Sequence, residues 1–145
     1  MRLLVSLGVA GVAIAATAGL AFGQDDPLAQ REALMKEMGA QAGISVKMIK
    51  GESPYDAAAA KAAMDKIAAN AAEIPSYFPE GSEGGDALPV IWENFSDFEA
   101  KATALKTAAE AAAAAADQGV EAFGPAFGAV GQACGACHQV YRKPS

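Results

Sequence analysis

Two cysteines and a histidine near the C-terminus are the residues whose types and spacing point most directly to chemistry. They lie in the stretch Cys134-Gly135-Ala136-Cys137-His138, which has the spacing of covalent haem attachment. Two thiols can add to the two vinyl groups of a haem as thioethers, and the imidazole after the second cysteine can bind the iron. In a helix, positions i, i+3 and i+4 share one face, so the three side chains would address the same flat ligand.

Two other kinds of site use cysteines at this spacing. A thioredoxin-like dithiol needs strand–helix–strand patterning around it, which the sequence lacks, and a structural zinc site needs further Cys or His ligands. The whole chain has two Cys and one His. Haem attachment is therefore the favoured interpretation, with a redox dithiol or an accidental match as the alternatives.

Composition favours one helical domain. The chain has 145 residues, 52% of them hydrophobic, with 11 basic and 17 acidic side chains and a formal net charge of -6. Such a length bounds one domain, and alanine runs at 57–60 and 111–116 favour helix. The acidic balance argues against nucleic acid as a partner.

The N-terminus has the features of a secretory signal peptide. Arg2 precedes an uncharged apolar run over 3–22, and Ala21 and Gly23 are the small residues that a signal peptidase reads. We expect residues 1–23 to be a cleaved signal peptide and 24–145 to be the mature domain. The alternative is an uncleaved membrane anchor, because the run is nearly long enough to span a bilayer. Export fits the haem motif, since bacteria attach haem covalently outside the cytoplasmic membrane, so we expect a periplasmic protein.

Four stretches carry helical patterns bounded by start and stop signals. They run over about residues 27–50, 54–74, 97–117 and 120–143. Asp26, Ser53 and Ser96 are the expected N-caps of the first three helices. Pro125 should either kink the fourth helix or mark its start.

The segment between the second and third helices predicts a long crossover. Residues 75–89 contain three prolines and three glycines, which argue against a regular element. Ile91 and Trp92 follow, and we interpret them as a hydrophobic plug at one end of the domain, with direct haem contact as the alternative. No strand pattern appears. The sequence therefore predicts an all-α, antiparallel four-helix bundle with a covalently bound haem between its helices.

Together these features resemble the class II c-type cytochromes, the cytochrome c′ superfamily. Tyr141 and Arg142 follow the haem motif as in the family's Cys-x-x-Cys-His-x-x-Tyr/Phe-Arg ending, and 50–56 (KGESPYD) and 91–92 (IW) are similar to recurrent family stretches. The resemblance covers essentially the whole sequence after residue 23. It implies a periplasmic four-helix bundle whose haem motif lies near the C-terminus.

The resemblance also implies roles for individual residues. Cys134 and Cys137 would hold haem c through its vinyl groups, and His138 would be the proximal iron ligand. Arg142 would lie beside the proximal imidazole. Arg31 matches an arginine that the family places near a haem propionate, where charge pairing is favourable, although a solvated first-turn arginine is the simpler alternative.

Met35 occupies the position that separates two functions in this superfamily. High-spin members have an apolar, non-ligating residue there, and their five-coordinate iron binds nitric oxide or carbon monoxide. Low-spin members place a methionine there as the sixth ligand, which raises the reduction potential and blocks other ligands. We therefore expect a monohaem electron carrier with Met35 as distal ligand, and a gas-binding protein is the alternative.

The partners follow from the same resemblance. A carrier of single electrons would meet redox partner proteins through its haem edge. Family members often pair through their first two helices, and the small residues of the second helix permit a homodimer. The chain shows no nucleophile–base arrangement and no pair of acids in an evident cleft, so we do not expect an enzyme.

Overall fold

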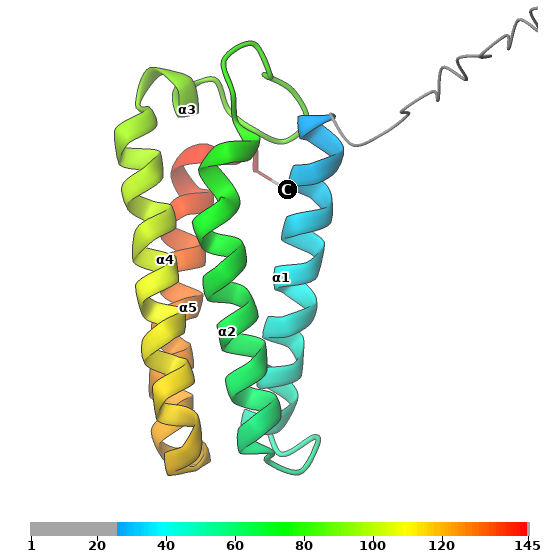
Figure 1. The fold of residues 1–145 in the computed structure, drawn as a ribbon, viewed down its shortest axis with the longest axis vertical. Helices are drawn as coiled ribbons and strands as arrows, with labels where there is room; N and C mark the ends of the chain where they lie inside the picture. Colours follow the sequence, from blue (N-terminus) through cyan, green and yellow to red (C-terminus); the bar gives the residue numbers. More distant parts are fainter. Residues whose placement is uncertain (1–25, 145) are drawn as a thin grey trace, which may run out of the picture.

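The structure, a computed structural model, describes residues 26–144. The expected signal peptide at 1–23 lies outside the described residues. The elements are α1 (Pro27–Ile49), α2 (Ala57–Glu73), the 3₁₀ turn η1 (Ile74–Tyr77), α3 (Val90–Glu93), α4 (Phe95–Ala115), the 3₁₀ turn η2 (Ala116–Gln118) and α5 (Val120–Tyr141). The four long helices run antiparallel in chain order (Figure 1). The predicted all-α four-helix bundle is confirmed.

Local signals place the start of α1 and the ends of two helices as predicted. The Asp26 side chain accepts a hydrogen bond from the Leu28 amide at 3.0 Å, and Pro27 opens the helix. Gly51 follows α1 with φ +72° and Gly119 follows α4 with φ +94°, conformations that favour glycine. Within residues 26–144, no helix is long and apolar enough to cross a membrane.

Two predicted N-caps are wrong. The backbone amide of Ser53 bonds to the Lys47 carbonyl at 3.3 Å, so Ser53 belongs to the turn after α1. Asp56 caps α2 instead, accepting from the amide of Ala59 at 3.0 Å. Ser96 lies inside the first turn of α4, which begins at Phe95.

Pro125 does not mark the beginning of the last helix. α5 begins at Val120, directly after Gly119, and continues through Pro125 to Tyr141. The helix that carries the cysteines and the histidine is therefore one long element, and it is held along its length against α4.

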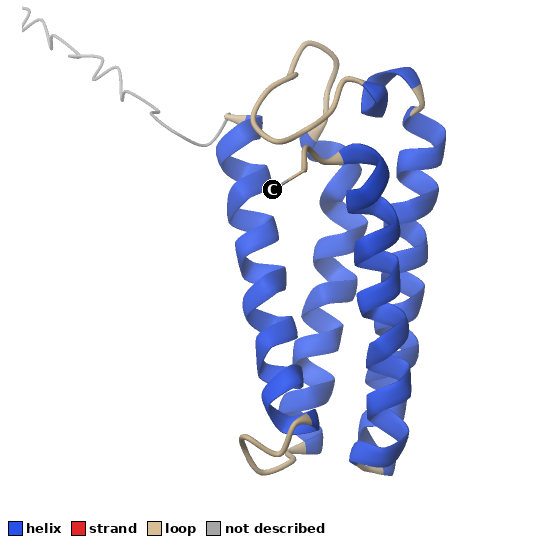
Figure 2. Ribbon diagram, turned by 180° about the vertical axis from the view of Figure 1, so that it is seen from behind, coloured by secondary structure: helices blue, strands red, loops and turns tan. Residues whose placement is uncertain are grey.

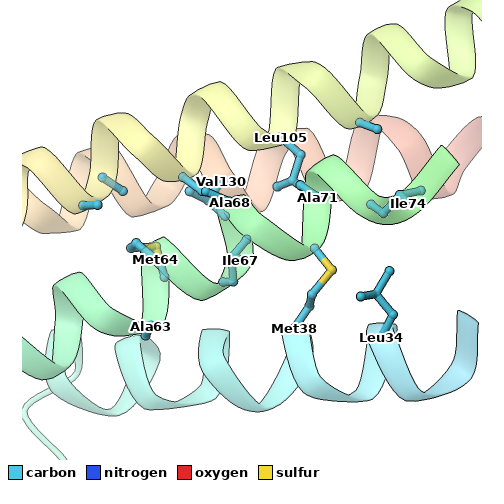
Figure 3. Packing of buried hydrophobic residues seen from close by; sticks show 14 of the residues in the cluster. Leu34, Met38, Ala63, Met64, Ile67, Ala68, Ala71, Ile74, Leu105 and Val130 are labelled. Atoms are coloured by element: carbon cyan, nitrogen blue, oxygen red, sulfur yellow. The ribbon is translucent and has the colours of Figure 1, made fainter. Parts of the chain in front are cut away.

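The core is built on α2 and its neighbours. Figure 3 shows apolar side chains of α1 and α2 meeting between those helices, with residues of α4 and α5 on the far side of α2. Many buried positions are alanines: Ala60, Ala63, Ala68, Ala71, Ala102, Ala109, Ala112, Ala113 and Ala116. Such small side chains let the helix backbones approach closely.

The crossover between η1 and α4 folds over one end of the bundle, beside the C-terminal end of α5 (Figure 2). The Leu88 amide donates to the Tyr141 carbonyl at 3.0 Å, and the Lys143 amide donates to the Asp86 carbonyl at 2.8 Å. Trp92 donates its indole N–H to the Pro79 carbonyl at 2.9 Å. These bonds tie the crossover to α3 and to the end of the haem motif.

Candidate functional site

A cavity of about 480 Å³ lies at this end of the bundle, between α1, α5 and the crossover. Five of the six predicted site residues line it, namely Arg31, Met35, Cys137, His138 and Arg142. Cys134 lies one turn before Cys137 on α5, partly buried against the core. The fold thus brings the ends of α1 and α5 together around one space, although these residues are about a hundred positions apart in the sequence.

The two cysteines are free and partly buried. Burial raises the pKa of both thiols, and for Cys137 the nearby Lys101 charge opposes this effect. A dithiol oxidoreductase depends on a thiolate formed at a lowered pKa. The environment of these thiols therefore gives the dithiol alternative no support.

His138 offers an imidazole to the same cavity. The residue is exposed overall, and partial desolvation followed by the Arg142 charge lowers its pKa. A lowered pKa favours the neutral imidazole, the form that binds metals. No group within residues 26–144 hydrogen-bonds its ring, so both nitrogens are open to a ligand or to solvent.

Arg31 is buried, with 7% of its surface exposed, and its guanidinium holds the crossover. Nε donates to the Tyr77 carbonyl at 2.6 Å, and Nη2 donates to the Ser82 carbonyl at 2.8 Å and also to the Ser82 hydroxyl. Its guanidinium carbon lies 4.1 Å from the centroid of the Phe78 ring. The alternative of a solvated arginine is therefore wrong.

One nitrogen of this guanidinium is unsatisfied. Nη1 of Arg31 is buried and has no hydrogen-bond partner. Desolvation lowers the pKa of Arg31, and the charges of Asp26 and Glu83 oppose that shift only in part. A buried cation with a free N–H beside a cavity is suited to a carboxylate supplied by a ligand.

Met35 and Arg142 line the cavity from two elements, α1 and the residue that follows α5. Met35 is partly buried and packs against the core. Arg142 is exposed and lies 3.7 Å from the Asp86 carboxylate, an ion pair between two solvated side chains. Both residues therefore line the same cavity as His138.

Sequence reasoning missed the tertiary partners of the site. Tyr141 is buried in the cavity wall and its hydroxyl donates to Asp97 at 2.5 Å, a pairing that no sequence pattern indicated. Phe78 and Phe98 also line the cavity. The only local signal for these residues was their apolar or acidic character, which does not indicate a partner.

The chemistry of the cavity fits a haem. Its volume lies within the range of about 300–1,000 Å³ that is usual for cofactor sites. Apolar walls including Phe78, Ile91 and Phe98 suit a flat macrocycle, and the unsatisfied Nη1 of Arg31 suits a propionate. His138 can supply the iron ligand at the same wall as Cys137.

Similarity to known proteins agrees with this fit. Residues 26–142 match the family model described as Cytochrome C'. Cytochrome c-556 from Agrobacterium fabrum is 46% identical over 114 residues, covering 78% of each chain. Cytochrome c' from Alcaligenes xylosoxydans xylosoxydans is 37% identical over 120 residues, covering 82% of this chain and 94% of that protein.

Solved structures show the same fold. A nitric oxide complex of a variant of cytochrome c prime from Alcaligenes xylosoxidans superimposes with a TM-score of 0.77 at 36% identity, covering 83% of this chain and 95% of the other. The family match over residues 26–142 includes both helices that carry the predicted site residues.

Proposed function

The chain belongs to the cytochrome c′ family, and we propose that it is a periplasmic electron carrier with His138 and Met35 as axial ligands. Proteins of this family carry covalently bound haem c and act as electron carriers or gas-binding proteins. The observation that carries the proposal is that residues from α1 and α5 with the required chemistry line one cavity.

Four side chains would hold the cofactor. Cys134 and Cys137, on one face of α5, would form the two thioethers, and His138 would supply the proximal nitrogen. The unsatisfied Nη1 of Arg31 would be available to a propionate, while Nε and Nη2 hold the crossover. A haem bound in this way supplies an iron that exchanges one electron between its ferrous and ferric states.

Met35 determines which function the site has. Its place in the wall of the cavity that His138 also lines, but on α1, supports its use as the second axial ligand. A thioether ligand favours the reduced iron and prevents other molecules from binding. We infer that the protein passes single electrons between redox partner proteins and excludes diatomic gases.

Gas binding is the second candidate, and a specific observation favours it. Several of the similar solved structures are nitric oxide complexes of cytochrome c prime. In that case Met35 would crowd the cavity without binding iron. Nitric oxide or carbon monoxide would then be the natural ligand.

Two methionines on α1 allow a matched test. Met35 lines the cavity, whereas Met38, less than one turn further on, is buried in the core with 7% of its surface exposed. Replacing either by leucine removes the thioether at nearly constant volume. We expect Met35→Leu to convert low-spin to high-spin iron and to allow carbon monoxide binding by the reduced protein, while Met38→Leu keeps the wild-type absorption spectrum.

Two results would contradict ligation by Met35. One is a Met35→Leu spectrum that stays low-spin. The other is a wild-type protein that is already high-spin and binds carbon monoxide readily, which would instead support the gas-binding function.

A further inference from the structure

Tyr141, which is buried with 3% of its surface exposed, holds the last turn of α5 against its neighbours. Its hydroxyl donates to Oδ2 of Asp97 on α4 at 2.5 Å, and its carbonyl accepts from the Leu88 amide of the crossover at 3.0 Å. Its ring meets Phe98 edge-on, with centroids 5.3 Å apart. The turn is thus held by its side chain and by its backbone.

His138 lies one turn before Tyr141 and has no comparable hold of its own. Within residues 26–144 nothing hydrogen-bonds the imidazole. Metal-binding histidines usually have their ring orientation set by a hydrogen bond from the other ring nitrogen. Here the orientation must come from the helical turn that carries the ring, and Tyr141 is what fixes that turn.

We propose that Asp97 is a positioning residue for the iron ligand: through its hydrogen bond to Tyr141 it sets the orientation of the turn that carries His138. The inference rests on the proposed function, because it requires His138 to bind haem iron. Asp97 has this position because the start of α4 packs beside the end of α5, and its neighbour Phe98 forms the wall against which the Tyr141 ring rests.

The Asp97 carboxylate has a second effect, which is separable from the first. It accepts the hydrogen bond of Tyr141, which lines the same cavity as Cys137, and Lys101 Nζ, 3.7 Å from the same carboxylate oxygen, balances its charge in part. A negative charge beside the haem attachment point favours ferric over ferrous iron. The hydrogen bond therefore controls ligand orientation, and the charge lowers the reduction potential.

Four single variants of the haem-loaded protein, and one double variant that combines Tyr141→Phe with Asp97→Ala, separate these effects. Tyr141→Phe and Asp97→Ala each remove the hydrogen bond, whereas Asp97→Asn keeps an acceptor for the tyrosine and removes the charge. Glu99→Gln is the control, because it removes an exposed carboxylate two residues away on the same helix. Electron paramagnetic resonance of the ferric protein reports the ligand geometry, and a redox titration reports the potential.

We expect Tyr141→Phe and Asp97→Ala to shift the g-values in the same direction, and the double variant to shift them no further. Asp97→Asn should restore the wild-type g-values while raising the potential, and Glu99→Gln should change neither. If Asp97→Ala does not fold, Tyr141→Phe and Asp97→Asn carry the test by themselves.

The positioning role would be overturned if Tyr141→Phe had wild-type g-values. It would also be overturned if the g-values of Asp97→Asn differed from wild type as much as those of Tyr141→Phe do. A pyridine haemochrome assay on each sample separates this failure from that of the proposed function. Covalent haem with unshifted g-values overturns the positioning role alone, whereas a wild-type protein without covalent haem overturns both.

Discussion

The buried guanidinium of Arg31 should contribute more to the free energy of unfolding than a solvent-exposed arginine on a helix would. It donates charge-assisted hydrogen bonds to two carbonyls, those of Tyr77 and Ser82, each worth about 1.5–3 kcal/mol. Its contact with the Phe78 ring adds about 1 kcal/mol. Removing the side chain also removes the free-energy cost of burying its charge, which offsets the loss of stability by about 2 kcal/mol. We therefore expect Arg31→Ala to destabilise the haem-loaded protein by about 3 kcal/mol.

Thermal and denaturant unfolding monitored by circular dichroism measure this loss. About 3 kcal/mol corresponds to a Tm lowered by about 10 °C for a domain of this size. Arg142→Ala is the matched control, because it removes an exposed cation from the same cavity wall whose ion pair, at 3.7 Å, joins two solvated side chains. Such a pair contributes about 0–1 kcal/mol.

The location of the effect is a second readout. Loss of Arg31 frees the crossover at Tyr77 and Ser82, so amide hydrogen exchange should accelerate over residues 77–88 more than in α2 or α4. Equal stability losses in Arg31→Ala and Arg142→Ala, or exchange that accelerates uniformly over the bundle, would refute the reasoning.

Three further predictions concern other parts of the chain. Gly43→Ala should stabilise the protein by about 0.5–1 kcal/mol, because a Cβ at this mid-helix position meets nothing within 4 Å. Gly51→Ala should destabilise it by about 1 kcal/mol, because Gly51 has a φ of +72°. Chemical denaturation of both variants measures these opposite changes in the free energy of unfolding. Burial and the hydrogen bond to Asp97 raise the pKa of Tyr141 to about 12, so the protonated phenol stabilises the fold and this stability is lost as pH rises from about 10 to 12. The loss should disappear in Tyr141→Phe. The same dependence of stability on alkaline pH in both proteins would contradict this prediction. Cys134→Ser should leave one thioether, at Cys137, and move the pyridine haemochrome band to longer wavelength because one vinyl group stays conjugated; an unshifted band would exclude Cys134 as an attachment point.

Signals carried by neighbouring residues predicted most of the fold. Asp26 and Pro27 start α1, Gly51 follows its end, and the haem motif lies on one continuous helix, as expected. Each of these features depends on hydrogen bonds or backbone angles within a few positions. Composition and helical periodicity were therefore sufficient to predict a bundle.

The predictions that failed depend on how the chain reverses between helices. Ser53 carries a cap signal, but the turn after α1 uses its backbone amide, and Asp56, three residues on, caps α2 instead. Ser96 precedes a suitable acid, yet α4 begins before it, at Phe95. Two competing cap signals a few residues apart cannot be ranked without the tertiary position of the helix.

The interactions of the site were also beyond local reasoning. Arg31 meets carbonyls 46 and 51 positions away, and Tyr141 meets Asp97 44 positions away. Every residue has a backbone carbonyl, so the sequence does not show which carbonyls will accept these bonds. An acidic residue at the start of a helix is also common for local reasons, so Asp97 did not indicate a distant partner. The sequence could therefore name residues that line the cavity, but not the residues that hold them in place.

The absorption spectra of the oxidised and reduced protein, with and without carbon monoxide, test the central claim most directly. Axial ligation by His138 and Met35 predicts low-spin spectra in both oxidation states and no change when carbon monoxide is added to the reduced protein. A high-spin spectrum, together with ready carbon monoxide binding, would contradict it and leave Met35 as a residue that only fills the distal side of the cavity.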